Sequence, residues 1–397
     1  IHLVLAKTEG ARPGTAGISL FIVPKFWVEE DGSMGGWNDV TTVNIEHKLG
    51  IHGSSTCTLA FGENNECYGW LVGGQEPVEG RGKGMAQMFR FMNEERLNTG
   101  LFSLGCIGSA YYAALDYAKV RVQGRKSTDP KGGQVRIIEH EDVRRMLLLQ
   151  KSCTEAIRAL LYQTYYYVDL SHEADDPETR AYADDMFMIN NPVCKAYASD
   201  MAWLLTQEAI QVHGGYGFME EYAPASLARD SKIYSIWEGT NFIQAQDFTG
   251  RKFTMKEGQP FKKWLSEIDE FISQQKTDKF AAEFTVLGEA QNDLKEILAL
   301  NEEWGQNNKQ LKQLFATRTL HAAARVYCGK LMLDQGILAA QKLAEVGEDH
   351  FDAGFYKGKM ASASFYVMNV VPEVAGFARA MKNADTSAID IPEDSFM

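Results

Sequence analysis

Apolar residues change their spacing along the chain, and the first part carries the spacing of β-strands. Residues 1–80 contain short runs of β-branched and aromatic residues, of which 17–24 is the clearest, and glycine-containing turns separate them. Short apolar runs bounded by turn residues are typical of strands. We therefore expect a β-rich region over 1–80, with further strands at 1–5 and two more within 43–61.

The next part of the chain carries the spacing of α-helices. Apolar residues recur there every three or four positions, which places them on one face of a helix. The pattern predicts long helices over 85–122, 141–169 and 177–212, and the last of these runs into the pair Gly214-Gly215. Glycine directly after a periodic stretch is a common helix stop. We therefore expect a helical domain over 81–251.

The last part of the chain is helical in a different way. It is rich in Lys, Glu, Gln, Ala and Leu and has almost no strand pattern. Amphipathic stretches predict helices over 261–275, 280–300, 308–346 and 355–381. Four helices with short connections are typical of an antiparallel bundle. We therefore expect a helical extension over 252–397.

Composition adds limits to this picture. The chain has 397 residues, 45% of them hydrophobic and 23% charged, and its net charge is −13. A length beyond ~250–300 residues predicts more than one domain. An acidic chain without a cluster of Lys and Arg is not expected to bind nucleic acid. The sequence has no apolar run of about 18 residues, so we expect no membrane span.

The cysteines indicate the cellular compartment of the protein, and the first residues indicate where in a domain the sequence begins. The six cysteines are scattered, without a CxxC pair or a histidine at metal-ligand spacing. This pattern is typical of reduced thiols, so we expect a cytoplasmic protein without a metal site. The chain opens at Ile1 with a strand pattern and no initiator Met, so we expect it to begin inside a domain.

The segment 211–241 holds the most informative candidate chemistry. A glycine pair lets a ligand approach the backbone closely. An acid beside an aromatic ring is a candidate general base, because partial desolvation would raise its pKa. The alternative is that the glycines only end a helix and that the acid caps a turn, and spacing alone leaves both open. The residues concerned are Gln211, Gly214, Gly215, Trp237, Glu238, Gly239 and Thr240.

These residues, with Arg229-Asp230 between them, resemble the signature of the acyl-CoA dehydrogenase family in type and order. The resemblance covers about residues 1–250, and 252–397 resemble the extra helical domain of the longer subgroup that includes 3-(methylthio)propionyl-CoA dehydrogenase. It implies an α+β fold: the C-terminal half of the family's middle β-domain at 1–80, a four-helix-type FAD- and acyl-CoA-binding catalytic domain at 81–251, and the extension. The family's N-terminal α-domain is absent from the sequence.

The resemblance also implies a reaction. In the family, FAD oxidises an acyl-CoA thioester to a trans-2-enoyl-CoA, as in fatty-acid β-oxidation, and electrons pass to electron-transferring flavoprotein. A carboxylate takes the α-proton while a hydride leaves the β-carbon for flavin N5. By motif match Glu238 is this base, and its backbone N–H is one donor to the thioester carbonyl, where negative charge develops.

A second acid, Glu95, is the alternative base. It directly precedes Arg96, and in a few branches of the family the base occupies this position. Those branches lack the acid before the Gly-Thr pair, whereas this chain has it, so we favour Glu238. The alternative role for Glu95 is an ion pair with Arg96 or Arg90, because buried charges are usually paired.

The resemblance further implies which residues bind FAD. Gln211, Gly214 and Gly215 match positions that contact the adenosine and pyrophosphate half of FAD in a neighbouring subunit, and Thr240 matches a position near the FAD of its own subunit. Arg121 matches an arginine that binds the pyrophosphate across the dimer. This sharing implies a homo-oligomer, and a homodimer rather than a tetramer if the C-terminal extension occupies the face where a second dimer would dock. The surrounding residues depart from the family pattern, and the alternative for Arg121 is a helix-end cation that interacts with the helix dipole.

Two other functions remain open at this stage. An acyl-CoA oxidase would share the first half of the reaction and pass electrons to O2. A non-catalytic scaffold member would have lost the base or the flavin site, and the presence of Glu238, Gly214 and Gly215 argues against it. The sequence leaves the acyl-chain specificity open.

Overall fold

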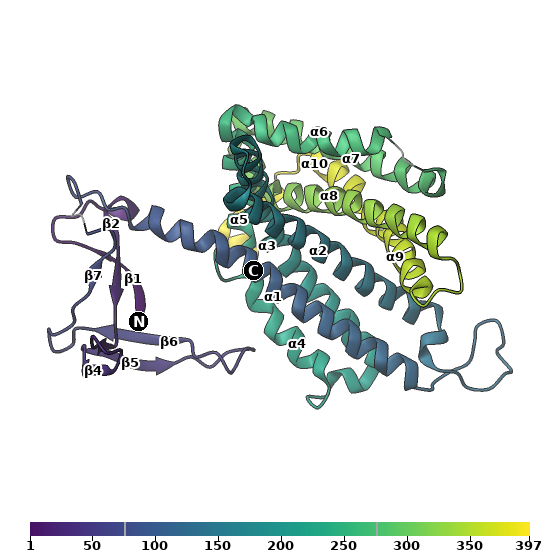
Figure 1. Cartoon of the computed structure of the whole chain (residues 1–397), viewed down its shortest axis with the longest axis horizontal. Helices are drawn as coiled ribbons and strands as arrows, with labels where there is room; N and C mark the ends of the chain where they lie inside the picture. Colours follow the sequence, from purple (N-terminus) through teal and green to yellow (C-terminus); the bar gives the residue numbers. More distant parts are fainter. Residues whose placement is uncertain (75–76, 275–276) are drawn as a thin grey trace. The chain divides into compact units, whose positions relative to one another are not determined.

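The computed structural model describes residues 1–74, 77–274 and 277–397, which form two compact units (Figure 1). The first unit, Ile1–Glu95, holds the strands, and the second, Arg96–Met397, is helical. Helix α1 (Gly84–Val120) begins in the first unit and continues into the second. The expected α+β class is confirmed.

The first unit contains small antiparallel sheets. β1 pairs with β2, with His2 opposite Val23 and Lys7 opposite Ile18, and β2 also pairs with β7. Two further ladders join β3 to β4 and β5 to β6, so the strands expected at 1–5, 17–24 and within 43–61 are confirmed. The strands are β1 (His2–Lys7), β2 (Ile18–Val23), β3 (Phe26–Val28), β4 (Met34–Trp37), β5 (Val40–Ile45), β6 (Cys57–Phe61) and β7 (Trp70–Leu71).

Two buried polar side chains tie the loops of this unit together. The Asn38 amide donates to the carbonyls of Pro24 and Tyr68, at 2.7 and 2.8 Å, and accepts from the Tyr68 N–H. The Asp39 carboxylate accepts from the backbone and side-chain N–H groups of Asn64, at 2.7 and 2.9 Å. These bonds satisfy backbone groups that strand pairing leaves unpaired.

Long helices dominate the second unit. α2 (Glu141–Glu173) and α3 (Pro177–His213) follow α1, so the helices expected over 85–122, 141–169 and 177–212 are confirmed. Asp176 caps α3 by accepting hydrogen bonds from the N–H groups of the first turn, and the proline that follows suits the first helical position. At the other end α3 stops at Gly214, whose φ of +60° is costly for any residue with a Cβ.

Shorter helices complete this unit, and they correct one expectation. The single helix expected over 355–381 is wrong: the chain there forms α9 and α10 with a π-helical turn, Tyr366–Val370, between them. Pro372 follows this turn and cannot donate the N–H that a continuous helix needs. Gln275, the expected end of the helix over 261–275, lies outside the described residues. The elements are α4 (Ala223–Ser231), α5 (Asn241–Asp247), α6 (Gln259–Gln274), α7 (Ala281–Asn307), α8 (Lys309–Val346), α9 (Ala353–Phe365), α10 (Glu373–Lys382) and α11 (Ser387–Asp390).

Besides a smaller cluster of buried residues around Ala114, a large hydrophobic core runs through the second unit. It joins residues of α1, α2 and α3 to residues of α6, α7, α8 and α10. Trp264 of α6 is fully buried, stacks on Tyr327 of α8 with ring centroids 5.0 Å apart, and donates its indole N–H to Asn190 of α3 at 3.0 Å. The helices before and after residue 251 therefore share their apolar interior, and the boundary between 81–251 and 252–397 stays a prediction.

Candidate functional site

Glu238 lies in a tight turn that leads into α5. Its φ is +55°, and that of Gly239 is +83°. A positive φ is unfavourable for a residue with a side chain, so neighbouring contacts must hold it. The Glu238 carbonyl accepts from Arg96 Nε at 3.4 Å and from Gln244 Nε2 at 3.3 Å, and the Gln244 amide also donates to the Gly239 carbonyl at 3.1 Å.

Arg96 of α1 is a buried cation that contacts this turn. Only 4% of its surface is exposed, and its guanidinium pairs with Asp247 of α5 at 3.5 Å. Burial lowers the pKa of Arg96, and the charge of Asp247 opposes that shift. Arg96 thus contacts both ends of the segment from Glu238 to Asp247, and its pairing fits the rule that buried charges find partners.

A second buried cation, Lys195 of α3, was missed by the sequence reasoning. Its side chain is fully buried, and its ammonium donates to the Asn241 amide oxygen at 2.9 Å. Burial lowers the pKa of Lys195 to about 8, while the charges of Asp200 and Glu238 oppose the shift. A lone lysine within the apolar stretch 192–198 was the available signal, because lysine is rarely buried unless it is paired with a polar or charged group.

Aromatic rings lie in the segment before Glu238. The Trp237 ring lies 5.5 Å from that of Tyr234 and 6.4 Å from that of Phe102 of α1. The Trp237 indole N–H is buried and has no hydrogen-bond partner among the described residues. An unpaired buried donor is costly, which suits a place where a bound ligand supplies the acceptor.

Four of the five residues predicted to bind FAD line one pocket. Arg121, Gln211, Gly214 and Gly215 surround a cavity of about 490 Å³ in the second unit. Thr240 is not among them: it caps the start of α5, where its hydroxyl accepts from the Ile243 N–H at 3.4 Å. Glu238 also lies outside this pocket.

The pocket suits a phosphate-bearing ligand. A Cβ added to Gly214 or Gly215 would meet no atom within 4 Å, so the backbone there is open to close approach. The Arg121 guanidinium lies 5.6 Å from the centre of the Tyr216 ring and supplies a positive charge. The residues present thus fit the pyrophosphate and adenosine half of FAD.

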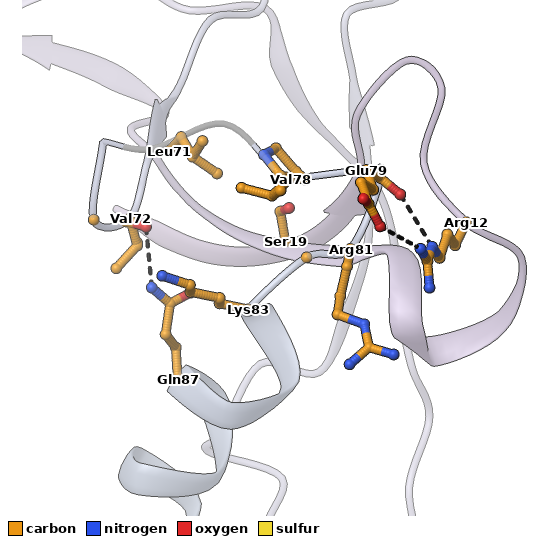
Figure 2. A pocket seen from close by; sticks show the side chains of 12 residues that line it. Arg12, Ser19, Leu71, Val72, Val78, Glu79, Arg81, Lys83 and Gln87 are labelled. Carbon is orange, nitrogen blue, oxygen red and sulfur yellow. Dashed lines mark hydrogen bonds and ion pairs between the residues drawn. The ribbon is translucent and has the colours of Figure 1, made fainter.

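The first unit has a pocket of its own at the start of α1, also of about 490 Å³ (Figure 2). Arg12, Arg81 and Lys83 bring positive charge to it, and Arg12 pairs with Glu79 at 3.1 Å. Ser19, which is only 2% exposed, lines the pocket from β2 (Figure 2). The pocket can therefore hold an anionic group.

Steric crowding explains why glycines stand beside this pocket. A Cβ on Gly82 would lie 2.1 Å from the Ile18 carbonyl oxygen, and one on Gly84 would lie 2.4 Å from the carbonyl carbon of Ser19. At Gly82 and Gly84 the loop therefore passes too close to β2 for a residue with a side chain. This close approach brings the start of α1, with its unpaired N–H groups, to the edge of the pocket.

The remaining expectations concern Glu95, metal ions and membranes. Glu95 is half-buried on α1, directly before Arg96. Within the part of the chain that the structure describes, no cluster of His, Cys, Asp and Glu could hold a metal ion. None of the helices in the described ranges has the length and apolar character needed to cross a bilayer.

Comparison with known families identifies the class of protein. Residues 82–251 match the profile of the acyl-CoA dehydrogenase C-terminal domain, and residues 264–392 match the profile described as acetyl-CoA dehydrogenase C-terminal like. The chain belongs to the acyl-CoA dehydrogenase family, as its motifs predict.

Individual proteins of this family are also similar to the chain. Two butyryl-CoA dehydrogenases of Syntrophomonas wolfei are 72% and 68% identical to the whole chain, which covers 65% of each. The chain thus spans about two thirds of the length of these relatives. A solved acyl-CoA dehydrogenase from Bacillus anthracis, complexed with FAD, shares the fold with a TM-score of 0.71 at 21% identity, over 96% of this chain and 60% of that one.

Proposed function

We propose that this chain is the larger part of a FAD-dependent acyl-CoA dehydrogenase that oxidises butyryl-CoA to trans-2-butenoyl-CoA. The observation that carries the proposal is Glu238, held in a left-handed turn by Arg96 and Gln244, at the position of the family's base. The identity of 72% and 68% to two butyryl-CoA dehydrogenases supports a short straight-chain substrate. The open pocket around Gly214 and Gly215 supports FAD.

Glu238 acts as the general base of this reaction. Its carboxylate takes a proton from the α-carbon of the thioester, and its backbone N–H donates to the thioester carbonyl, on which negative charge develops. The flavin, when bound, accepts the hydride that leaves the β-carbon. The rings of Trp237 and Tyr234, with centroids 5.5 Å apart, lie in the segment directly before Glu238.

The test is anaerobic mixing of the full-length protein with butyryl-CoA. We expect loss of the flavin absorbance and formation of trans-2-butenoyl-CoA, with recovery of the colour when electron-transferring flavoprotein is added. Rapid peroxide formation in air would instead identify an acyl-CoA oxidase. A colourless protein that does not bind added FAD would identify a scaffold.

Gly215→Leu is expected to weaken FAD binding by about tenfold or more, because the new side chain would occupy the open face of the pocket. Titration of the FAD-free protein with FAD, followed by fluorescence, measures this. Gly376→Leu on α10 is the matched control, since a Cβ there also meets no atom within 4 Å. Equal FAD affinity in both variants would place the cofactor elsewhere.

FAD shared between subunits also predicts the assembly. Thr240 lies outside the pocket that Arg121 and Gln211 line, as expected if one subunit contacts two FAD molecules. We therefore propose a homodimer, which light scattering on the full-length protein measures.

The basic pocket at the start of α1 is proposed to hold the phosphates of coenzyme A. Lys83→Ala is expected to raise KM for butyryl-CoA about tenfold, because a hydrogen bond to a charged group contributes about 1.5–3 kcal/mol. The KM for butyryl-pantetheine, which lacks these phosphates, should not change. Lys7→Ala, which removes an exposed lysine of the same unit, is the control. An equal rise in KM for both thioesters would exclude a phosphate contact.

A further inference from the structure

A hydrogen-bonded chain of side chains connects α8, in the C-terminal part of the protein, to the turn that carries Glu238. It begins at His321 of α8, whose Nε2 lies 2.8 Å from Asp200 Oδ2 on α3. On the other side of the ring, Arg325 Nη1 lies 3.2 Å from His321 Nδ1. Arginine has only donors, so Nδ1 accepts and the ring proton sits on Nε2, where it is donated to Asp200.

The second link runs from Asp200 to α5. The other Asp200 oxygen, Oδ1, accepts from the Asn241 side-chain amide at 2.7 Å. Asn241 is 8% exposed, and its own amide oxygen accepts from Lys195 at 2.9 Å. It is the first residue of α5 and lies three residues after Glu238. Its side chain therefore fixes the C-terminal side of the turn in which Glu238 lies.

His321, where this hydrogen-bonded chain of side chains begins, is held as firmly as Asn241, where it ends. Arg325 is 7% exposed, and its Nη2 pairs with Glu373 of α10 at 2.6 Å. Its guanidinium also lies 5.5 Å from the centre of the Tyr197 ring, and that ring forms a T-shaped pair with His321, with centroids 5.6 Å apart. Residues of α8, α10 and α3 thus fix the plane of the imidazole.

We propose that His321 is a positioning residue for Glu238, which acts through Asp200 and Asn241. The inference rests on the proposed role of Glu238 as base. The turn has an unfavourable positive φ at Glu238, so it keeps its shape only while contacts on both sides hold it. Arg96 and Gln244 hold the carbonyls of the turn. The hydrogen-bonded side chains that begin at His321 hold Asn241, which follows the turn.

This assigns a catalytic task to residues 264–392, the part that matches the second family profile. His321, Arg325 and Glu373 all belong to that part, whereas Asp200 and Asn241 belong to the first matched region. The C-terminal helices thereby set the geometry of the base in addition to sharing a core with the catalytic helices. A base displaced by about 1 Å can lose up to a hundredfold in rate.

The test compares His321→Ala with His321→Gln in the full-length protein with FAD bound. Glutamine can donate to Asp200 and accept from Arg325, whereas alanine can do neither. The probe is (methylthio)acetyl-CoA, in which sulfur replaces the β-carbon so that no hydride can leave. NMR in D2O then follows exchange of its α-protons, which reports on the base alone. We expect exchange to slow about tenfold in His321→Ala, with unchanged affinity for the probe, and to recover in His321→Gln.

Two further variants separate this proposal from a general loss of stability. Asn301→Ala removes a buried amide that bonds to Thr319, which lies on the same helix as His321. Neither residue belongs to the hydrogen-bonded chain of side chains, so this variant should leave the exchange of α-protons unchanged. In an Asp200→Asn background, His321→Ala should have little additional effect, because the link is already broken. Equal slowing in His321→Ala and Asn301→Ala, or full additivity with Asp200→Asn, would overturn the positioning role. Undiminished exchange in Glu238→Gln would instead overturn the proposed base.

Discussion

Glu238→Gln is expected to slow α-proton exchange from (methylthio)acetyl-CoA by about 10⁴-fold, at the upper end of the range for loss of a general base. The amide has nearly the shape of the carboxylate, so the turn keeps its hydrogen bonds from Arg96 and Gln244 to the backbone carbonyl. Only the ability to take a proton is lost. The residues proposed to bind FAD are not changed, so the variant should remain yellow and keep its affinity for the acyl-CoA.

Glu95→Gln is the matched control, because Glu95 is the alternative base. We expect it to retain exchange within about tenfold of the unchanged protein, with any loss arising from its neighbour Arg96, which holds the Glu238 carbonyl. If exchange instead stops in Glu95→Gln and persists in Glu238→Gln, the two assignments must be reversed. Exchange that survives in both variants would require a base that neither the motif nor the turn indicates.

The residues around Gly214 show what the sequence can predict. A periodic helix that ends at a glycine pair is a local signal, and α3 does end at His213 with Gly214 at a positive φ. Arg121 directly follows α1 and Gln211 lies in the last turn of α3, so the motif match also names residues that the fold brings to one pocket. Local patterns and motif order together therefore predicted this part of the candidate site.

For Lys195 and His321, the sequence could not predict the polar groups to which they bond. Both lie in the interior of long helices whose local pattern gives no sign of a polar partner. Their importance comes from Asp200 and Asn241, which the tertiary fold places beside them. A single sequence records which residues are polar, whereas pairing between residues 46 and 121 positions apart on different helices depends on packing.

The loop over 80–84 was predictable only in part. Its alternating glycines are obvious in the sequence and lack the spacing of a nucleotide-binding loop, but the sequence alone gives no steric reason for them. The structure supplies it: the backbone of β2 lies where the side chains at Gly82 and Gly84 would be. The helix expected over 355–381 failed for a similar reason, since a π-helical turn follows from packing rather than from local propensity.

Trp264→Ala is expected to lower the free energy of unfolding of the second unit by about 3–5 kcal/mol, the usual cost of removing a large buried aromatic side chain. The indole is fully buried between Phe261 and Tyr327, with ring centroids at 5.7 and 5.0 Å, and it donates to Asn190. Its removal would leave a cavity where α3, α6 and α8 meet. Denaturant unfolding of the full-length protein, followed by far-UV circular dichroism, measures this loss.

Trp264→Phe is the control that separates the ring from its N–H. Phenylalanine keeps most of the stacking on Phe261 and Tyr327 but leaves the Asn190 oxygen without its donor, which costs about 1–3 kcal/mol. Because one core joins the helices on both sides of residue 251, both variants should shift the unfolding of α2 and α3 together with that of α7 and α8. Hydrogen exchange resolved by segment tests this: if Trp264→Ala loosens only the helices after residue 251, the two parts fold independently and the shared core does not couple them.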